Sequence, residues 1–252
     1  MKSAKRTTVI TGAASGIGGA LARRLAGPDV NLLLTTRSNE GDLRLVAEAA
    51  KGLGSRVETV CCDLADPNEV KSVVSRAVDV FGGIDAIVSN AGSADRTPLG
   101  ELNQSDLHRA FDVMAAAFLH LTQAALPSLR ASDIPRVIAV SSFVAHRYRN
   151  AANIFPASAA AKAGLEALVK SLAVDLAGDG IPVNCVVPGH IEKDARAHLA
   201  GRAERAAQVE GLIPMRRLGQ PDDVAAVIEF LLSPGAAYMT GQLVHVDGGL
   251  TL

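Results

Sequence analysis

Short apolar runs alternate with longer amphipathic segments along most of this 252-residue chain. The buried strands of a parallel sheet are short and almost continuously apolar, and the helices that connect them are apolar on one side only. The alternation therefore predicts an α/β fold with a parallel sheet and helices on both of its faces. The predicted strands are Thr7–Ile10, Asn31–Thr35, Val57–Cys62, Ala86–Ser89, Arg136–Ser141, Pro182–Val187 and Leu243–Val246.

Helices are predicted between these strands, at residues 16–26, 40–53, 67–81, 104–130, 157–178 and 222–232. Residues 192–210 also have a helical composition, but they are inserted between a Pro-Gly turn and Pro214. We expect them to belong to a substrate lid over residues 190–214. The sequence shows no repeat, no low-complexity linker and no break in composition, so we expect a single domain spanning residues 1–252.

Composition argues against several classes of function. The net charge of −1 and the pI of about 6.6 give no positive field for nucleic acid or an acidic membrane. The chain has no tryptophan, no apolar stretch of the ~18 residues that a membrane helix needs, and no signal-peptide pattern at its basic N-terminus. Three cysteines, an odd number, favour a reduced, cytoplasmic setting. No cysteine or histidine cluster has the spacing of a metal site.

A glycine-rich segment, Thr-Gly-Ala-Ala-Ser-Gly-Ile-Gly at residues 11–18, follows the first predicted strand and opens a helix. Glycines permit a tight turn and let the backbone approach a pyrophosphate, which the positive end of the helix attracts. The strand before the turn and the helix after it predict a dinucleotide site. The residues expected to hold the cofactor here are Gly12, Ser15, Gly16, Ile17 and Gly18.

Further candidate cofactor contacts follow the third and fourth predicted strands. Asp63 and Leu64 follow the third, where a carboxylate can accept a hydrogen bond from the adenine amino group, although this acid could also cap a helix. Asn90, Ala91 and Gly92 follow the fourth. Their small size would let the backbone lie against the cofactor ribose, although Asn-Ala-Gly is also a common turn.

The type of cofactor depends on the end of the second predicted strand. An acidic residue there would bind the 2′-hydroxyl group of NAD. This chain has Thr36 at that position, followed by Arg37, whose guanidinium group can pair with a 2′-phosphate. We therefore predict NADP(H) rather than NAD; the alternative is that Arg37 is simply solvated.

Together with segments near the C-terminus, these motifs resemble the short-chain dehydrogenase/reductase family over nearly the whole chain. Residues 217–225, 238–242 and 246–249 are similar to the closing helix, loop and last strand of that family. The resemblance implies a Rossmann-type, doubly wound sheet and further cofactor contacts at Pro188, Gly189 and Ile191.

The resemblance also implies a homodimer or homotetramer that pairs through helices 104–130 and 157–178 and through the last strand. Apolar residues at helical spacing on these two helices could form either the interface or the core. They are Phe111, Phe118, Leu121, Leu165, Leu168 and Leu172.

In this family an asparagine, a serine, a tyrosine and a lysine form a proton relay beside the nicotinamide. By resemblance Ser142 and Lys162 match the serine and the lysine, whereas Ser158 stands at the position of the tyrosine and Met114 at that of the asparagine. Lys193 stands where the family usually has a threonine. A serine hydroxyl is a far weaker acid than a phenol of pKa ~10, and losing a general acid typically costs ~10²–10⁴ in rate. We expect Ser142, Ser158 and Lys162 at the catalytic site, with altered acid–base chemistry.

Three other side chains are candidates to replace the missing phenol as a proton donor. His146 and Tyr148 lie on the loop that follows Ser142, and His190 lies just after the Pro-Gly turn. The alternatives are a polar surface loop for the first two and lid packing for His190.

Basic residues predicted near the mouth of the pocket would favour an acidic substrate. They are Arg147, Arg149, His190 and Lys193, partly offset by Glu192 and Asp194.

Three functions remain open from the sequence alone. The first is an NADP(H)-dependent oxidoreductase acting on a small carbonyl or alcohol substrate. The second is a non-redox enzyme that catalyses an elimination, isomerisation or cyclisation on the same scaffold, and the third is a cofactor-binding protein without catalysis. The changes at Met114 and Lys193 in addition to Ser158 favour natural divergence over a single engineered substitution.

Overall fold

The computed structural model describes residues 5–148, 154–192 and 208–252. Its seven strands form one parallel sheet in the order β3-β2-β1-β4-β5-β6-β7. They are β1 (Arg6–Ile10), β2 (Val30–Thr36), β3 (Arg56–Cys61), β4 (Ala86–Ser89), β5 (Arg136–Val140), β6 (Val183–Pro188) and β7 (Leu243–Val246). The predicted α/β fold is confirmed, and no strand end differs from its predicted position by more than one residue.

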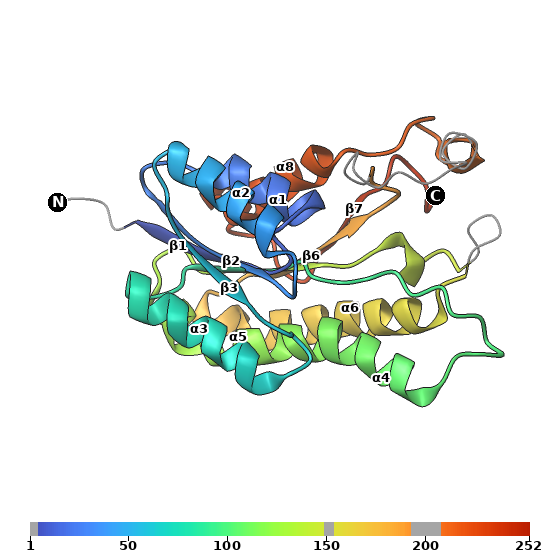
Figure 1. The fold of residues 1–252 in the computed structure, drawn as a ribbon, viewed down its shortest axis with the longest axis horizontal. Helices are drawn as coiled ribbons and strands as arrows, with labels where there is room; N and C mark the ends of the chain where they lie inside the picture. The colour runs from blue at the N-terminus through green and yellow to red at the C-terminus, as the bar shows by residue number, and fades with distance from the viewer. Residues whose placement is uncertain (1–4, 149–153, 193–207) are drawn as a thin grey trace.

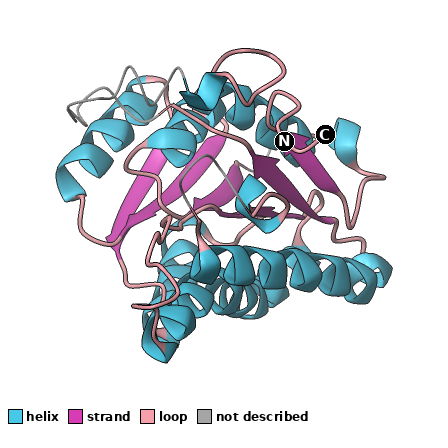
Figure 2. Cartoon of the chain, turned by 90° about the vertical axis from the view of Figure 1, so that its right-hand side faces the viewer, coloured by secondary structure: helices cyan, strands magenta, loops and turns pink. Residues whose placement is uncertain are grey.

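Helices cover both faces of this sheet, as Figures 1 and 2 show. One face carries α1 (Gly16–Leu25), α2 (Glu40–Gly52) and α8 (Pro221–Leu232). The other carries α3 (Pro67–Phe81), α4 (Gln104–Phe111), α5 (Ala117–Ala131) and α6 (Pro156–Leu176). The fold is therefore doubly wound, as predicted. Among the described residues, no helix combines the length and apolar content needed to cross a membrane.

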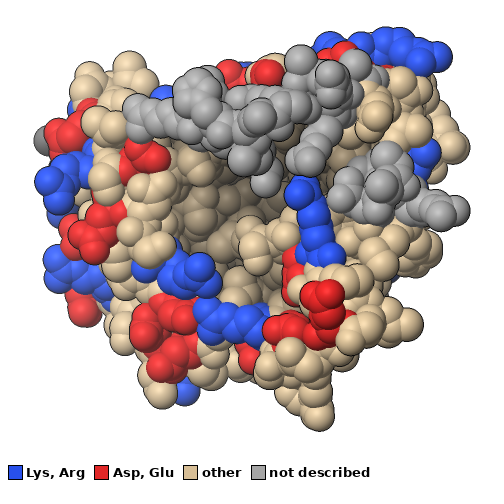
Figure 3. All heavy atoms as spheres, turned by 45° about the vertical axis from the view of Figure 1, so that its right-hand side comes forward, with Lys and Arg blue, Asp and Glu red and all other residues tan. Residues whose placement is uncertain are grey.

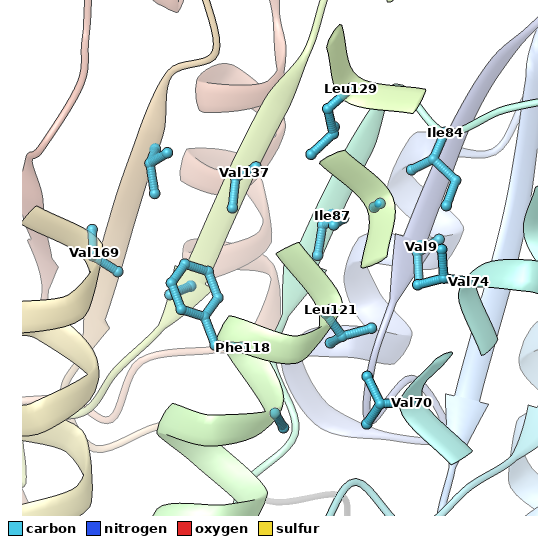
Figure 4. Packing of buried hydrophobic residues seen from close by; sticks show 14 of the residues in the cluster. Val9, Val70, Val74, Ile84, Ile87, Phe118, Leu121, Leu129, Val137 and Val169 are labelled. Carbon is cyan, nitrogen blue, oxygen red and sulfur yellow. The ribbon is translucent and has the colours of Figure 1, made fainter. Parts of the chain in front are cut away.

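The core has two layers because successive residues of a strand point to opposite faces of the sheet. Val9 of β1 and Ile87 of β4 lie in the layer that also contains Phe118 of α5 (Figure 4). Ile10 and Leu34 belong to the layer beneath α1, α2 and α8. All five side chains are fully buried, which explains why the strands are almost continuously apolar in sequence.

The predicted helix at 104–130 is divided into two α-helices. A π-helical turn, Asp112–Ala116, lies between α4 and α5 and carries the buried Met114. Such turns admit one extra residue into an α-helix, and an amphipathic pattern does not reveal them.

The apolar residues considered for a subunit interface fall into two groups. Phe118, Leu121 and Leu165 are buried in the core of the chain itself. Phe111, Leu168 and Leu172 are only partly buried against that core. Phe118, Leu121 and Leu165 therefore belong to the core of the chain, which was the alternative to a subunit interface.

The strand order places a crevice at one edge of the sheet. β1 pairs with both β2 and β4, and the order of connection reverses between β1 and β4. In open parallel sheets, ligands bind at such a switch point, outside the carboxyl ends of the strands. The glycine-rich turn after β1 and the segment after β4 meet there.

Candidate active site

A cleft of about 1160 Å³ opens at the switch point of the sheet. Figure 3 shows that this end of the molecule is hollowed. Most of the predicted cofactor residues line the cleft, namely Gly12, Ser15, Gly16, Ile17, Arg37, Asp63, Leu64, Asn90, Ala91, Gly92 and Ile191, together with Ser158. The remaining predicted residues, Gly18, Pro188, Gly189, Ser142 and Lys162, do not line it.

The glycine turn has the shape that a pyrophosphate requires. Gly12 and Gly16 adopt φ values of +65° and +53°, which favour glycine. A Cβ atom on Gly18 would lie 2.5 Å from the Gly12 carbonyl oxygen, so Gly18 lets α1 pack against the turn. Ser15 precedes α1, and its side chain makes no capping hydrogen bond. The turn and the positive end of α1 thus fit the phosphates of a dinucleotide.

Asn90 holds the end of β4 against this turn. Its side-chain Nδ2 donates to the carbonyl oxygens of Thr11 at 2.9 Å and Gly12 at 3.2 Å. Its backbone N–H donates to the Thr11 hydroxyl at 2.9 Å. The side-chain nitrogen of Asn90 is therefore committed to the scaffold.

Asp63 is paired with an arginine that the sequence analysis missed. Arg109 of α4 donates through Nη2 to both carboxylate oxygens of Asp63, at 3.0 and 2.8 Å. Hydrogen bonding to Arg109, and then to the backbone N–H of Ala65, holds the pKa of Asp63 below its ordinary value. The predicted adenine contact of Asp63 would have to share this carboxylate with Arg109.

Ser158 lies in the first turn of α6 and is 3 % exposed. Its hydroxyl accepts a hydrogen bond from the backbone N–H of Asp95 at 2.9 Å and donates one to the carbonyl oxygen of Ser93 at 3.2 Å. A serine hydroxyl carries a single proton for donation. In this arrangement that proton is directed to the backbone.

Lys162 lies one helical turn after Ser158 and is 7 % exposed. Its Nζ donates to the Val140 carbonyl oxygen at 2.6 Å. A Cβ atom on Gly92 would lie 3.3 Å from this Nζ and 3.8 Å from Sδ of Met114, so the ammonium group lies beside the segment that follows β4. Burial lowers the pKa of Lys162 to about 8. The ammonium group is therefore mostly charged at pH 7 but gives up its proton more readily than an exposed lysine.

Ser142 follows β5, where its hydroxyl accepts from the backbone N–H of Val144 at 3.4 Å. The preceding Ser141 donates to the buried carboxylate of Glu166 at 2.5 Å, and Nε2 of His146 lies 3.0 Å from the same oxygen. His146 is thus engaged by Glu166, a residue that the sequence analysis missed. In the sequence, Glu166 lies four residues after Lys162 on the same helix, but this spacing does not indicate a contact with His146.

His190 packs its ring against Phe143, with the ring centroids 4.3 Å apart. Its Nε2 atom is buried and has no hydrogen-bond partner among the described residues. Burial, and then the charges of Arg147 and Arg96, lower the pKa of His190 to about 4. The imidazole is therefore neutral at pH 7.

The remaining sequence predictions concern the rim of the cleft. Tyr148 is 69 % exposed. Arg149, Lys193 and most of the predicted lid, residues 193–207, lie outside the described residues. Within the described parts of the chain, no three histidine, cysteine or acidic side chains gather as metal ligands.

The strand order, the glycine turn at the switch point and the cleft together define a Rossmann-type dinucleotide-binding protein. A family profile described as enoyl-(acyl carrier protein) reductase matches residues 12–251. The 3-oxoacyl-[acyl-carrier-protein] reductase FabG of Thermotoga maritima is 34 % identical over 252 residues, covering 100 % of both chains. The chain therefore belongs to the short-chain dehydrogenase/reductase family. Members of this family are oxidoreductases that use nicotinamide cofactors.

Two solved structures resemble this fold closely. A short-chain dehydrogenase from Burkholderia cenocepacia in complex with NADP has a TM-score of 0.89 at 30 % identity and covers 99 % of this chain and 98 % of its own. A blue fluorescent protein from a metagenomic library in complex with NADPH also has a TM-score of 0.89 at 30 % identity, with 98 % of each chain covered.

Proposed function

We propose that this protein is an NADP(H)-dependent oxidoreductase that interconverts a carbonyl compound and an alcohol without using Ser158 as the acid. The observation that carries the proposal is the cleft at the switch point, which brings the glycine turn, Arg37 and the segment beside Lys162 together. Thr36 and Arg37 at the end of β2 favour a 2′-phosphate, and the two structural relatives above hold NADP or NADPH.

The residues that line the cleft each have a task in this proposal, and so does Ser142, which does not line it. When bound, the nicotinamide supplies or accepts the hydride. The glycine turn and the N-terminus of α1 hold the pyrophosphate, and Arg37 binds the 2′-phosphate. Ser142, whose hydroxyl makes only a long contact to Val144, donates a hydrogen bond to the substrate oxygen.

In this proposal Lys162 supplies the proton. One N–H of its ammonium group donates to Val140, and the described residues give Nζ no second hydrogen bond. During reduction, the carbonyl carbon gains the hydride and its oxygen gains the Lys162 proton. The products are the alcohol, the oxidised cofactor and a neutral amine, which regains a proton from water. A pKa near 8 suits a proton donor that works near neutral pH.

A second candidate function is cofactor binding without catalysis. The double hydrogen bond of Ser158 favours it, because this hydroxyl stabilises the structure where relatives would use a phenol. Retention of Lys162 would then serve ribose binding alone.

The discriminating experiment measures cofactor binding first and turnover second. We expect NADPH to raise the melting temperature more than NADH does, because a ligand that binds only the native state stabilises it. We then expect slow NADPH oxidation with one or more members of a carbonyl panel, abolished in Lys162→Met and raised about 10²-fold or more in Ser158→Tyr. If neither cofactor shifts the melting temperature, both candidates are wrong. If a cofactor raises the melting temperature but neither the wild type nor Ser158→Tyr turns over any substrate, the second candidate, cofactor binding without catalysis, is favoured.

We also propose a cytoplasmic homodimer or homotetramer that meets through α4 to α6 and β7. Val174 of α6 is 81 % exposed, and β7 lies at an edge of the sheet. The three cysteines are unpaired thiols, which suits a reducing compartment. Light scattering of the wild type and of Val174→Asp tests the assembly: a wild-type monomer would contradict it.

A further inference from the structure

Three nitrogen-bearing side chains contact one small apolar cluster. Two of them, Arg96 and His190, lie next in sequence to Asp95 and Ile191, which line the cleft. The buried members of this cluster are Phe143, Val144, Phe155, Ala159, Ile213 and Leu250. His190 packs on Phe143, the guanidinium group of Arg96 lies 5.7 Å from the ring centre of Phe155, and Nη1 of Arg147 donates to the Leu250 carbonyl oxygen at 2.7 Å. The three polar groups come from separate segments of the chain, and they lie close enough for the charges of Arg147 and Arg96 both to act on His190.

These groups have hydrogen-bonding capacity that the described residues leave unused. Five other arginines, Arg24, Arg76, Arg109, Arg130 and Arg217, each pair with a carboxylate. Arg96 and Arg147 pair with none of the described carboxylates. The neighbouring Asp95 accepts through one of its oxygens from the backbone N–H and hydroxyl of Thr97, at 2.8 and 2.6 Å.

His190 adds a buried donor or acceptor to this pair of arginines. Its Nε2 has no partner among the described residues, and a buried polar atom without a partner costs free energy. Since the imidazole is neutral at pH 7, it can donate one hydrogen bond through Nε2. An anion bound beside His190 would supply the partner that Nε2 lacks.

Ser158 determines where Arg96 lies. Its hydroxyl binds the backbone of Ser93 and Asp95, the residue directly before Arg96. Phe155, which supports the guanidinium group, precedes the first turn of the same helix. The N-terminal end of α6 therefore holds both the loop and the side chain of Arg96.

We propose that Arg96, Arg147 and His190 bind a carboxylate of the substrate, and that Ser158 is a positioning residue for Arg96. The substrate would then be an oxo acid, or the corresponding hydroxy acid, whose carbon chain lies on Phe143 and Phe155; this rests on the proposed function. Guanidinium groups match a planar carboxylate through paired hydrogen bonds. Two cations and a neutral imidazole suit a single negative charge better than the double charge of a phosphate monoester.

The test compares straight-chain oxo acids of four to eight carbons with their methyl esters. Dissociation constants are measured by thermal shift on the NADP-saturated protein. We expect the best acid to bind at least about 10-fold tighter than its ester. Arg96→Gln and Arg147→Gln should each weaken the acid about 10- to 100-fold and leave the ester and NADPH unchanged. Arg44→Gln, an exposed arginine of α2 that does not line the cleft, serves as the control.

The role of Ser158 is tested separately. Ser158→Ala should weaken acid binding while NADPH binding persists, and Ser158→Thr, which keeps a hydroxyl group, should restore it. Any of three results would overturn the proposed carboxylate site. The esters bind as well as the acids, no oxo acid binds the NADP-loaded protein, or the arginine variants leave acid binding unchanged. Failure to bind NADPH would instead contradict the proposed function.

Discussion

The backbone N–H of Asp95 donates a hydrogen bond to the hydroxyl group of Ser158 over 2.9 Å. The same hydroxyl donates to the carbonyl oxygen of Ser93 over 3.2 Å, so the first turn of α6 is joined to the segment after β4. Ser158 thus stabilises the loop that borders the cleft.

Replacing Ser158 with alanine should therefore lower the stability of the protein. Ser158→Ala removes the partner of one backbone donor and one backbone acceptor, and we expect the free energy of unfolding to fall by about 1–2 kcal/mol. Urea unfolding measures this change. Ser72→Ala is a matched control, because the Ser72 hydroxyl makes one exposed bond within α3 and its loss should cost less than about 0.5 kcal/mol. Equal effects of the two substitutions would contradict the bridging role.

Arg37 should determine the preference between the two nicotinamide cofactors. Arg37→Gln removes a cation at the end of β2, and we expect the dissociation constant of NADPH to rise about 10- to 100-fold while that of NADH stays the same. Titration of each cofactor by fluorescence gives both constants. Arg44→Gln again controls for the loss of a surface charge. A parallel loss of affinity for NADH would show that Arg37 does not distinguish the 2′-phosphate.

Gly18 should not tolerate a side chain. A Cβ atom at Gly18 would lie 2.5 Å from the Gly12 carbonyl oxygen and 2.6 Å from Nδ2 of Asn90, so the turn or α1 would have to shift. We expect Gly18→Ala to destabilise the protein by about 1–3 kcal/mol and to weaken cofactor binding. At Gly41 of α2 a Cβ atom would meet nothing within 4 Å, so Gly41→Ala should be neutral or stabilising by up to about 1 kcal/mol. Thermal unfolding with and without NADPH compares the two variants.

His190 should make the protein sensitive to mild acid. Its pKa is lowered from 6.5 to about 4 in the folded protein, so the unfolded chain binds more protons between these values. Stability contributed by the neutral imidazole is present above pH 6.5 and is lost as the pH falls toward 4. His190→Asn cannot take up that proton, and its stability should fall less over the same interval. Urea unfolding at pH 7, 6, 5 and 4 tests this; identical pH profiles for both proteins would refute it.

The elements that define the fold were predictable because their signals are local. Val9 and Ile10 point to opposite layers of the core, and this two-sided burial is what makes a parallel strand continuously apolar. The glycine turn has its own signal in the residues that flank it. These features depend on neighbours in sequence, and the structure reproduces them.

The polar pairs of the site were not predictable because they join distant segments. Asp63 meets Arg109 across 46 residues, and Ser158 meets Asp95 across 63 residues. No periodicity links such positions. The contacts of the candidate proton donors were not predictable for the same reason. The engagement of His146 by Glu166 depends on how α6 packs beneath the loop, which only the assembled fold reveals.

The π-helical turn between α4 and α5 determines the phase of the two helices relative to each other. Arg109, just before the turn, reaches Asp63 at the cleft, and Phe118, just after it, lies in the core. Each residue advances an α-helix by about 100°. Deleting a single residue from Asp112–Ala116 would rotate one helix against the other by about that angle, so the cleft contact and the core contact could not both survive.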